Sequence, residues 1–181
     1  MNWIENIFSK GTLSGRWDGA YAQHGRSFPI QAALKHRGNK LSGSIVDMEP
    51  CHNQSLRAML QESHMSNDEI EQLVVEIRSQ FPDTPEGEID YRSQLPEKSL
   101  VDGTVDGRQV SFVKRYEGYM EIEYVLNDLA LPDTVHCELI HYTGELSENC
   151  NTIAGEWTIP PPDDNGATVS GTFQLARRSP G

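Results

Sequence analysis

A five-residue pattern, in which a glycine stands midway between two large apolar residues, occurs six times in this chain. The copies are Leu13-Gly15-Trp17, Leu41-Gly43-Ile45, Val101-Gly103-Val105, Tyr142-Gly144-Leu146, Ile153-Gly155-Trp157 and Val169-Gly171-Phe173. Residues two apart in a β-strand share a face, so each copy places two bulky side chains and a gap on one side of a strand. A glycine inside a strand usually marks a bend or a close approach of another group. Six such positions predict a sheet that curves repeatedly, as closure into a barrel requires.

Alternating apolar residues and glycine-containing turns around these copies predict a mainly β fold. We expect an antiparallel up-and-down β-barrel of 8–9 strands, formed by residues 1–181 as a single domain. Two segments depart from the strand pattern. Residues 52–81 have the apolar spacing of an inserted helical hairpin, and Ser66 and Glu69 form a capping box for its second helix. Residues 82–98 are acidic and contain proline, and are expected to return as a loop.

Both predicted helical segments need a place to bury apolar side chains. The stripe of the second inserted helix is expected to lie over one mouth of the barrel; it consists of Ile70, Leu73, Val74, Ile77 and Phe81. A short N-terminal helix is predicted from the spacing of Trp3, Ile4, Ile7 and Phe8. This helix is expected to plug one end of the barrel, with docking on a partner or a membrane surface as the alternative.

The pairing of the later strands is predicted from alternation and turn residues. A two-residue turn at Asp106-Gly107 places Gly103 opposite Val110. A three-residue turn over 117–119 then pairs Phe112 with Tyr124 on one apolar face, because a slip by one residue would flip every side chain. A strand over 134–146 changes the phase of its alternation, which a bulge near Ile140 would explain.

The composition restricts the partners and the compartment. A formal net charge of -12 argues against binding nucleic acid or an anionic membrane, since both need a basic surface. No apolar run reaches the length of a transmembrane helix, and the first ten residues lack the pattern of a secretory signal. The three cysteines contain no C-x-x-C pair, which is typical of reduced structural thiols, with one disulfide as the alternative. We expect a cytoplasmic protein.

The two ends of the chain carry residues found in a known superfamily. Gly15-Arg16-Trp17 opens the first strand behind a short predicted helix, and Arg177 and Arg178 lie near the end of the last strand. This arrangement resembles the calycin superfamily of lipocalins, fatty-acid-binding proteins and avidin-like barrels. The resemblance implies that Trp17 is structural and that Arg177 or Arg178 packs across it as a cation–π pair that closes the base.

The inserted helical hairpin departs from that superfamily. Lipocalins carry their helix after the strands, and fatty-acid-binding proteins carry a helical lid between their first two strands. A flat antiparallel meander, somewhat like the MORN repeat, is the alternative fold. The irregular distances between the glycine copies count against a true repeat array.

Three functions are compatible with these patterns. The first is binding of a small apolar or amphipathic ligand inside a calycin-like barrel, under the helical lid. The residues assigned to this site are Phe112, Tyr124, Trp157 and Phe173 as the lining, with Lys114 or His141 at the polar end of the ligand. For Lys114 the alternative is a position at the barrel rim, with its ammonium group in water.

The second function is that of an interaction or assembly module, whose barrel is solid and whose apolar surface binds a protein partner. The third is an enzyme that uses an interior carboxylate or His141; the carboxylates near aromatic positions are Glu121, Glu123, Glu138 and Glu156. The sequence contains no nucleophile elbow, phosphate-binding loop, dinucleotide fingerprint or zinc spacing among its six histidines. No catalytic residue, metal or cofactor is therefore predicted.

Overall fold

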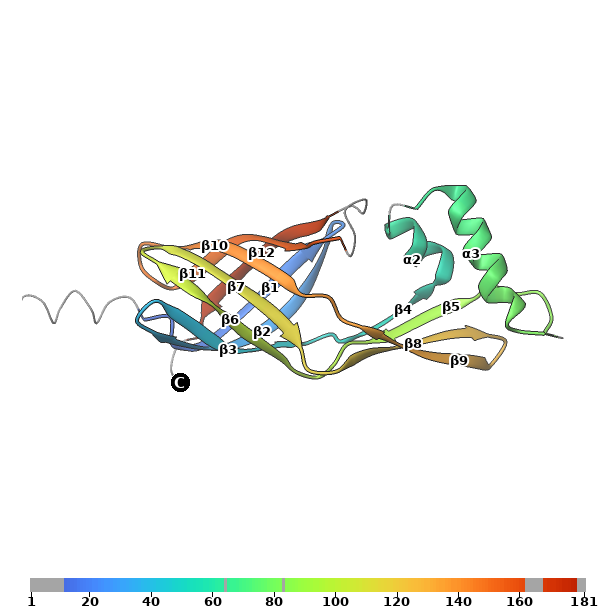
Figure 1. Cartoon of the computed structure of the whole chain (residues 1–181), viewed down its shortest axis with the longest axis horizontal. Coiled ribbons are helices and arrows are strands. Elements are labelled where there is room, and N and C mark those ends of the chain that lie inside the picture. The colour runs from blue at the N-terminus through green and yellow to red at the C-terminus, as the bar shows by residue number, and fades with distance from the viewer. Residues whose placement is uncertain (1–11, 64, 83, 162–167, 179–181) are drawn as a thin grey trace, which may run out of the picture. The chain divides into compact units, whose positions relative to one another are not determined.

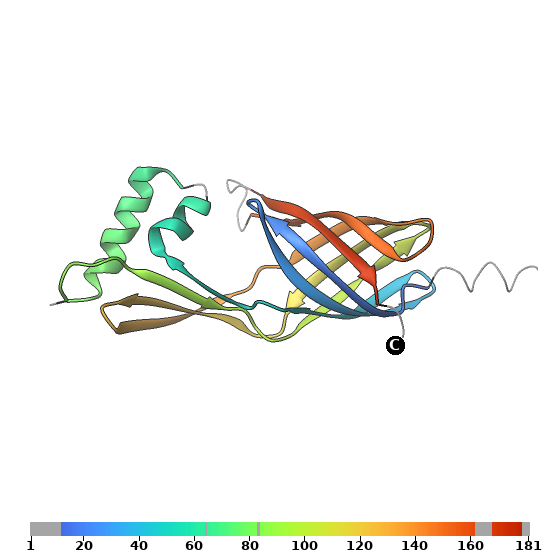
Figure 2. The same ribbon diagram turned by 180° about the vertical axis from the view of Figure 1, so that it is seen from behind.

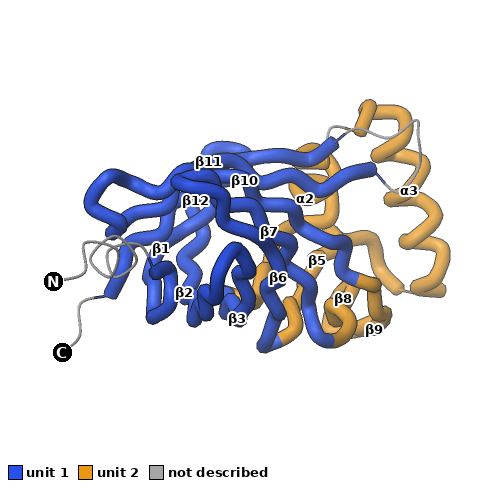
Figure 3. Tube along the Cα trace, turned by 60° about the vertical axis from the view of Figure 1, so that its left-hand side comes forward, with its two compact units in different colours: residues 1–48, 97–117, 137–181 blue, residues 49–96, 118–136 orange. Residues whose placement is uncertain are grey.

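A computed structural model describes residues 12–63, 65–82, 84–161 and 168–178. The chain divides into two compact units (Figure 3). Unit 1 comprises residues 1–48, 97–117 and 137–181, and unit 2 comprises residues 49–96 and 118–136. The predicted N-terminal helix lies outside the described residues, as do residues 64, 83, 162–167 and 179–181.

Unit 1 is a closed antiparallel barrel of eight strands (Figures 1 and 2). Its strands are β1 (Gly15–Gln23), β2 (Arg26–Arg37), β3 (Lys40–Asp47), β6 (Ser99–Asp106), β7 (Gln109–Tyr116), β10 (Ile140–Leu146), β11 (Thr152–Ile159) and β12 (Val169–Arg177). The order around the barrel is β1-β12-β11-β10-β7-β6-β3-β2, and β1 closes the ring by pairing with both β2 and β12. With the inserted segments set aside, each strand pairs with its neighbours in the chain, as the predicted up-and-down barrel requires.

The glycine pattern lines the barrel interior. Eleven of the twelve large residues that flank the glycines are buried, and the twelfth, Val169, packs against the same core. On neighbouring strands the glycines face large side chains: Gly103 pairs with Phe112, and Gly171 pairs with Trp157. A Cβ atom on Gly171 would lie 2.7 Å from the Trp157 ring and 2.0 Å from the carbonyl oxygen of Ala22. Glycine is therefore required here by a close approach of both a ring and the backbone.

Contacts around Trp17 join the start of β1 to the end of β12. This indole is fully buried and donates its Nε1–H to the carbonyl oxygen of Leu13 at 3.0 Å. The Arg177 guanidinium carbon lies 4.5 Å from the Trp17 ring centroid, within cation–π distance. Arg177 also donates to the carbonyl oxygens of Thr12, Ser14 and Cys150. Arg178, by contrast, is exposed and pairs with Asp18 on the outside of the barrel.

Unit 2 is formed by two insertions in the barrel and contains a second sheet and two helices. The sheet has the order β4-β5-β8-β9 and consists of β4 (Cys51–Ser55), β5 (Asp90–Gln94), β8 (Tyr119–Leu126) and β9 (Leu129–His136). The helices are α2 (Leu56–Glu62) and α3 (Asn67–Ser79). The capping box of α3 forms as predicted, with Ser66 and Glu69 accepting reciprocal hydrogen bonds from each other's backbone N–H groups.

The apolar stripe of α3 is buried inside unit 2, which corrects the prediction that it lies over a mouth of the barrel. The stripe joins a core made up of Leu56, Leu60, Ile70, Ile77, Phe81, Ile89 and Leu126. The predicted returning loop over 82–98 contains β5, which supplies part of the sheet that this core needs. The sequence of β5, Asp90-Tyr91-Arg92-Ser93-Gln94, lacks the apolar alternation that indicates a strand.

The predicted pairing of Phe112 with Tyr124 is wrong, because these residues belong to different sheets. Phe112 pairs with Gly103 and Tyr142 in the barrel, whereas Tyr124 pairs with Tyr91 and Leu131 in the second sheet. Gly118, at φ 127°, stands at the point where the chain leaves one sheet for the other. Apolar and polar residues alternate in the same phase in β7 and β8. This alternation shows which face of a strand is apolar, but it does not show which strand lies beside it.

Two further details of register differ from the prediction. The turn after β6 is Gly107-Arg108, so the pairing is shifted by two residues and Gly103 faces Phe112. A shift by two preserves the face of every side chain, which is why the burial pattern survives. The phase change over 134–146 results from the end of β9 at His136 and the start of β10 at Ile140, and not from a bulge within one strand.

The contrast between the two neighbouring arginines provides a test of the base closure. Arg177→Ala removes a cation–π contact and three hydrogen bonds to carbonyl oxygens, and we expect it to lower the free energy of unfolding by about 3 kcal/mol. Arg178→Ala removes an exposed ion pair, and we expect a loss below about 1 kcal/mol. Urea denaturation followed by circular dichroism measures both losses, and equal losses would contradict this account.

Candidate functional site

The aromatic side chains inside the barrel contact one another. Phe112 stacks on Tyr142 with ring centroids 4.7 Å apart, and Phe173 meets both rings edge-on at 6.0 and 5.0 Å. Trp157 is buried and lies edge-on to Tyr21 at 6.0 Å. Three of the residues predicted to line a ligand cavity, Phe112, Trp157 and Phe173, are thus packed in the barrel core.

A buried polar cluster lies among these rings. The ammonium group of Lys114 is fully buried and donates to both carboxylate oxygens of Asp47, at 2.9 and 2.7 Å. It also donates to the hydroxyl of Tyr116 at 2.8 Å, and that hydroxyl donates to Asp47 at 2.9 Å. Lys114 therefore does not lie at the water-exposed rim, one of the two positions predicted for it, and its charge is paired with Asp47 inside the protein.

Asp47 is the residue of this cluster that the sequence analysis missed. It follows Leu41, Gly43 and Ile45 at a spacing of two along β3, so its side chain lies on the same inward face. Its charge was not expected inside a barrel. A carboxylate and a lysine on inward faces of two strands are the sequence signal for a buried ion pair, since an unpaired buried charge is strongly unfavourable.

The cluster changes the ionisation of the groups around it. Burial lowers the pKa of Lys114, and the charge of Asp47 opposes that change. Burial, followed by the charge of Asp47, raises the pKa values of Tyr21, Tyr116 and Tyr142 far above their usual range. These phenols therefore stay neutral in the folded protein, where they surround the ion pair.

The other predicted site residues lie apart from this core. Tyr124 belongs to unit 2, where its ring is 5.9 Å from that of Tyr91. His141 is exposed on β10, opposite Val113 and Thr158. The four glutamates considered for acid–base chemistry lie at the surface: Glu121, Glu138 and Glu156 are exposed, and Glu123 is half-buried.

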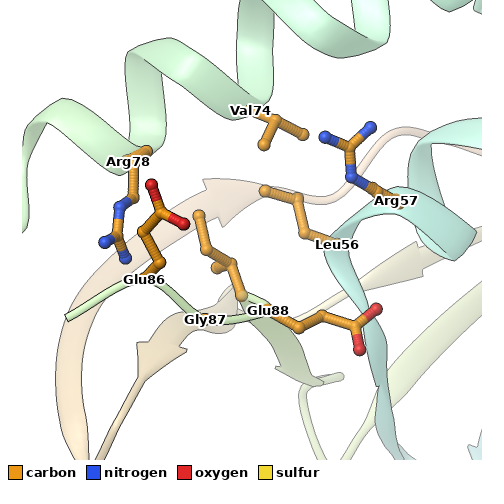
Figure 4. A pocket seen from close by; sticks show the side chains of 8 residues that line it. Leu56, Arg57, Val74, Arg78, Glu86, Gly87 and Glu88 are labelled. Atoms are coloured by element: carbon orange, nitrogen blue, oxygen red, sulfur yellow. The ribbon is translucent and has the colours of Figure 1, made fainter.

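Unit 2 contains a cleft of about 310 Å³ (Figure 4). It lies between the two helices and the segment that leads into β5, and its lining consists of Leu56, Arg57, Val74, Arg78, Glu86, Gly87, Glu88 and Ile89. Figure 4 shows Arg78 and Glu86 next to each other on one side, Arg57 on the opposite side, and Leu56 and Val74 between them. The cleft thus combines an apolar centre with charged ends.

The two arginines of the cleft differ in how their hydrogen-bonding groups are used. Arg57 forms a two-pronged ion pair with Glu71, which raises the pKa of Arg57 and lowers that of Glu71. Arg78 donates through Nη2 to the carbonyl oxygens of Thr84 and Pro85, both at 2.9 Å. The Nη1 atom of Arg78 is buried and has no hydrogen-bond partner among the described residues. Arg78 lines the cleft, and its unused Nη1 donor is covered by protein atoms in this structure.

The cleft has no signature in the sequence. Arg57 and Arg78 each follow a residue of a helical apolar face, Leu56 and Ile77 respectively, and such positions usually carry solvated charges. Nothing in the sequence pattern indicates that residues 84–89 return to the same helices.

Comparison of the chain with protein-family models, with curated proteins and with solved structures finds no match. Within the described residues, no helix is both long and apolar enough to span a membrane. The described residues also contain no group of three or more histidine, cysteine, aspartate or glutamate side chains placed to hold a metal. Cys51, Cys137 and Cys150 are not joined by disulfide bonds.

The buried phenols predict a specific alkaline sensitivity. Because the folded pKa of Tyr142 lies above its unfolded value of 10, its contribution to stability is complete below pH 10 and is lost as the pH rises further. Each such phenol makes the free energy of unfolding fall by about 1.4 kcal/mol per pH unit above pH 10. Tyr142→Phe should make that slope shallower by this amount.

Urea titrations between about pH 10.5 and 12 measure the slope for both proteins, and their difference cancels the groups that they share. The folded pKa of Lys114 is lowered, so above the usual pKa of lysine this group is deprotonated in both the folded and the unfolded protein. It therefore does not contribute to the slope in this range. Identical slopes for the wild type and Tyr142→Phe would show that this phenol ionises in the folded state.

Proposed function

We propose that this chain binds a small amphipathic molecule that carries an anionic group, and that the cleft of unit 2 is its site. The observation that carries the proposal is the buried Nη1 atom of Arg78, which has no hydrogen-bond partner among the described residues. Leaving a buried donor of a charged group unsatisfied lowers the stability of the folded protein by about 1–3 kcal/mol or more. Arg78 lines the cleft, so a carboxylate or similar oxygen there would supply the missing acceptor once the side chain turns Nη1 toward it.

The size and lining of the cleft support a ligand that is partly apolar. Its volume of about 310 Å³ is at the lower end of the range for small-molecule sites, and corresponds to roughly ten water molecules at liquid density. Leu56, Val74 and Ile89 contribute apolar side chains. A short hydrocarbon chain with one charged end matches both features.

The barrel is the other location considered for a ligand. We infer that unit 1 is a calycin-type barrel, and the placement of Arg177 over Trp17 supports this inference. In that superfamily a ligand would lie inside the barrel. Here the contacts among Phe112, Tyr142 and Phe173 favour a filled interior, so that the barrel acts as a rigid framework.

Binding of a protein partner has less support than binding in the cleft. The helical stripe that was considered for docking is buried in the core of unit 2. At the edge of the second sheet, β9 contains Pro132, which lacks an N–H group, and the N–H of Thr134 donates to the side chain of Asp133 at 2.7 Å. Both features disfavour the addition of another strand at this edge.

Titration of the full chain with hexanoate, followed by ¹H–¹⁵N NMR, tests the proposal. We expect saturable shifts at the Nε–H of Arg78 and at the amides of residues 84–89. Arg78→Gln should weaken binding by about tenfold or more, because a charged hydrogen bond contributes about 1.5–3 kcal/mol.

Arg92→Gln is the matched control, since Arg92 is an exposed arginine of β5 outside the cleft lining and the charge change is the same. The control should bind hexanoate like the wild type. Equal losses of hexanoate affinity in the two variants would contradict the proposal.

A further inference from the structure

The charged side chains that line the cleft disfavour a ligand that carries only a negative charge. The ion pair between Arg57 and Glu71 is internally neutral, which leaves the Arg78 cation and the carboxylates of Glu86 and Glu88. Both of these glutamates are exposed, and no hydrogen bond or ion pair joins either side chain to another described residue. A ligand with only a negative charge would be attracted by Arg78 but repelled by two carboxylates.

We infer that the ligand is a zwitterion, specifically a free α-amino acid with an unbranched or branched apolar side chain. This inference rests on the proposed function of the cleft. The α-carboxylate lies at the guanidinium of Arg78, and the adjacent ammonium group lies at Glu86, which is next to Arg78 (Figure 4). The side chain of the ligand then extends between Leu56, Val74 and Ile89.

The position of the charges distinguishes an α-amino acid from other zwitterions. In an α-amino acid the two charged groups share one carbon atom, and Arg78 and Glu86 are adjacent on one side of the cleft. Glu88 interacts electrostatically with Arg57, which lies at the other side of the cleft. A molecule with its charges at opposite ends would place its ammonium group near Glu88, and would leave Glu86 without a partner.

Three probes separate these possibilities. Hexanoate carries the carboxylate alone, 2-aminohexanoate adds the ammonium group beside it, and 6-aminohexanoate is the isomer with the ammonium group at the far end. Each has roughly the size that a cleft of about ten water volumes accepts. NMR titrations of the full chain near pH 7 should show that 2-aminohexanoate binds about fivefold more tightly than either of the other two, the gain expected for one solvent-exposed charge pair at contact distance.

A conservative variant tests whether the ammonium group of the ligand binds to Glu86. Glu86→Gln should weaken binding of 2-aminohexanoate by about fivefold and strengthen binding of hexanoate, because the same carboxylate attracts one ligand and repels the other. Glu76→Gln is the control, since it makes the same charge change on α3 outside the cleft lining. Glu86 is exposed, so the variant should fold normally.

The outcomes separate the inference from the function on which it rests. If hexanoate shifts Arg78 and binds as tightly as 2-aminohexanoate, the inference is overturned and the proposed function stands. Tighter binding of 6-aminohexanoate, or no difference between Glu86→Gln and Glu76→Gln, also overturns the inference. If none of the three probes shifts Arg78, both the inference and the proposed function fail.

Discussion

The structure of unit 1 depends on a match between inward glycines and inward rings. Gly103 pairs with Phe112, Gly155 with Phe173 and Gly171 with Trp157, so a large ring on one strand lies beside a gap on its neighbour. A methyl group at any of these glycines would collide with the neighbouring strand. This match lets eight strands close tightly enough for Phe112, Tyr142 and Phe173 to contact one another.

A barrel that is filled, as we propose, places the expected ligand site in unit 2. The interior charge of Lys114 is neutralised by Asp47. Unit 2 has a separate apolar core, and its cleft is lined by Arg78, whose buried Nη1 donor has no partner among the described residues. In this account the barrel supplies rigidity, while the inserted unit supplies the chemistry. Binding residues commonly lie on segments that a rigid scaffold positions.

The sequence predicted local structure better than it predicted which distant segments pack together. The alternation of strands, the capping box at Ser66 and the inward face of Trp17 follow from rules of period and spacing, which act within one segment. The separation of Phe112 from Tyr124 does not follow from them, because two strands in phase can join one sheet or two. Asp47 was predictable from its inward position on β3, whereas the cleft depends on how residues 84–89 fold back on the helices.

Crystals of the protein pressurised with xenon test the central claim directly, because xenon occupies empty apolar cavities. If the rings fill the barrel, the wild type should show no xenon between Phe112, Tyr142 and Phe173, and Phe173→Ala should open a cavity that binds xenon there. A xenon atom among these three rings in the wild-type barrel would contradict the account, and would return the ligand site to the barrel interior.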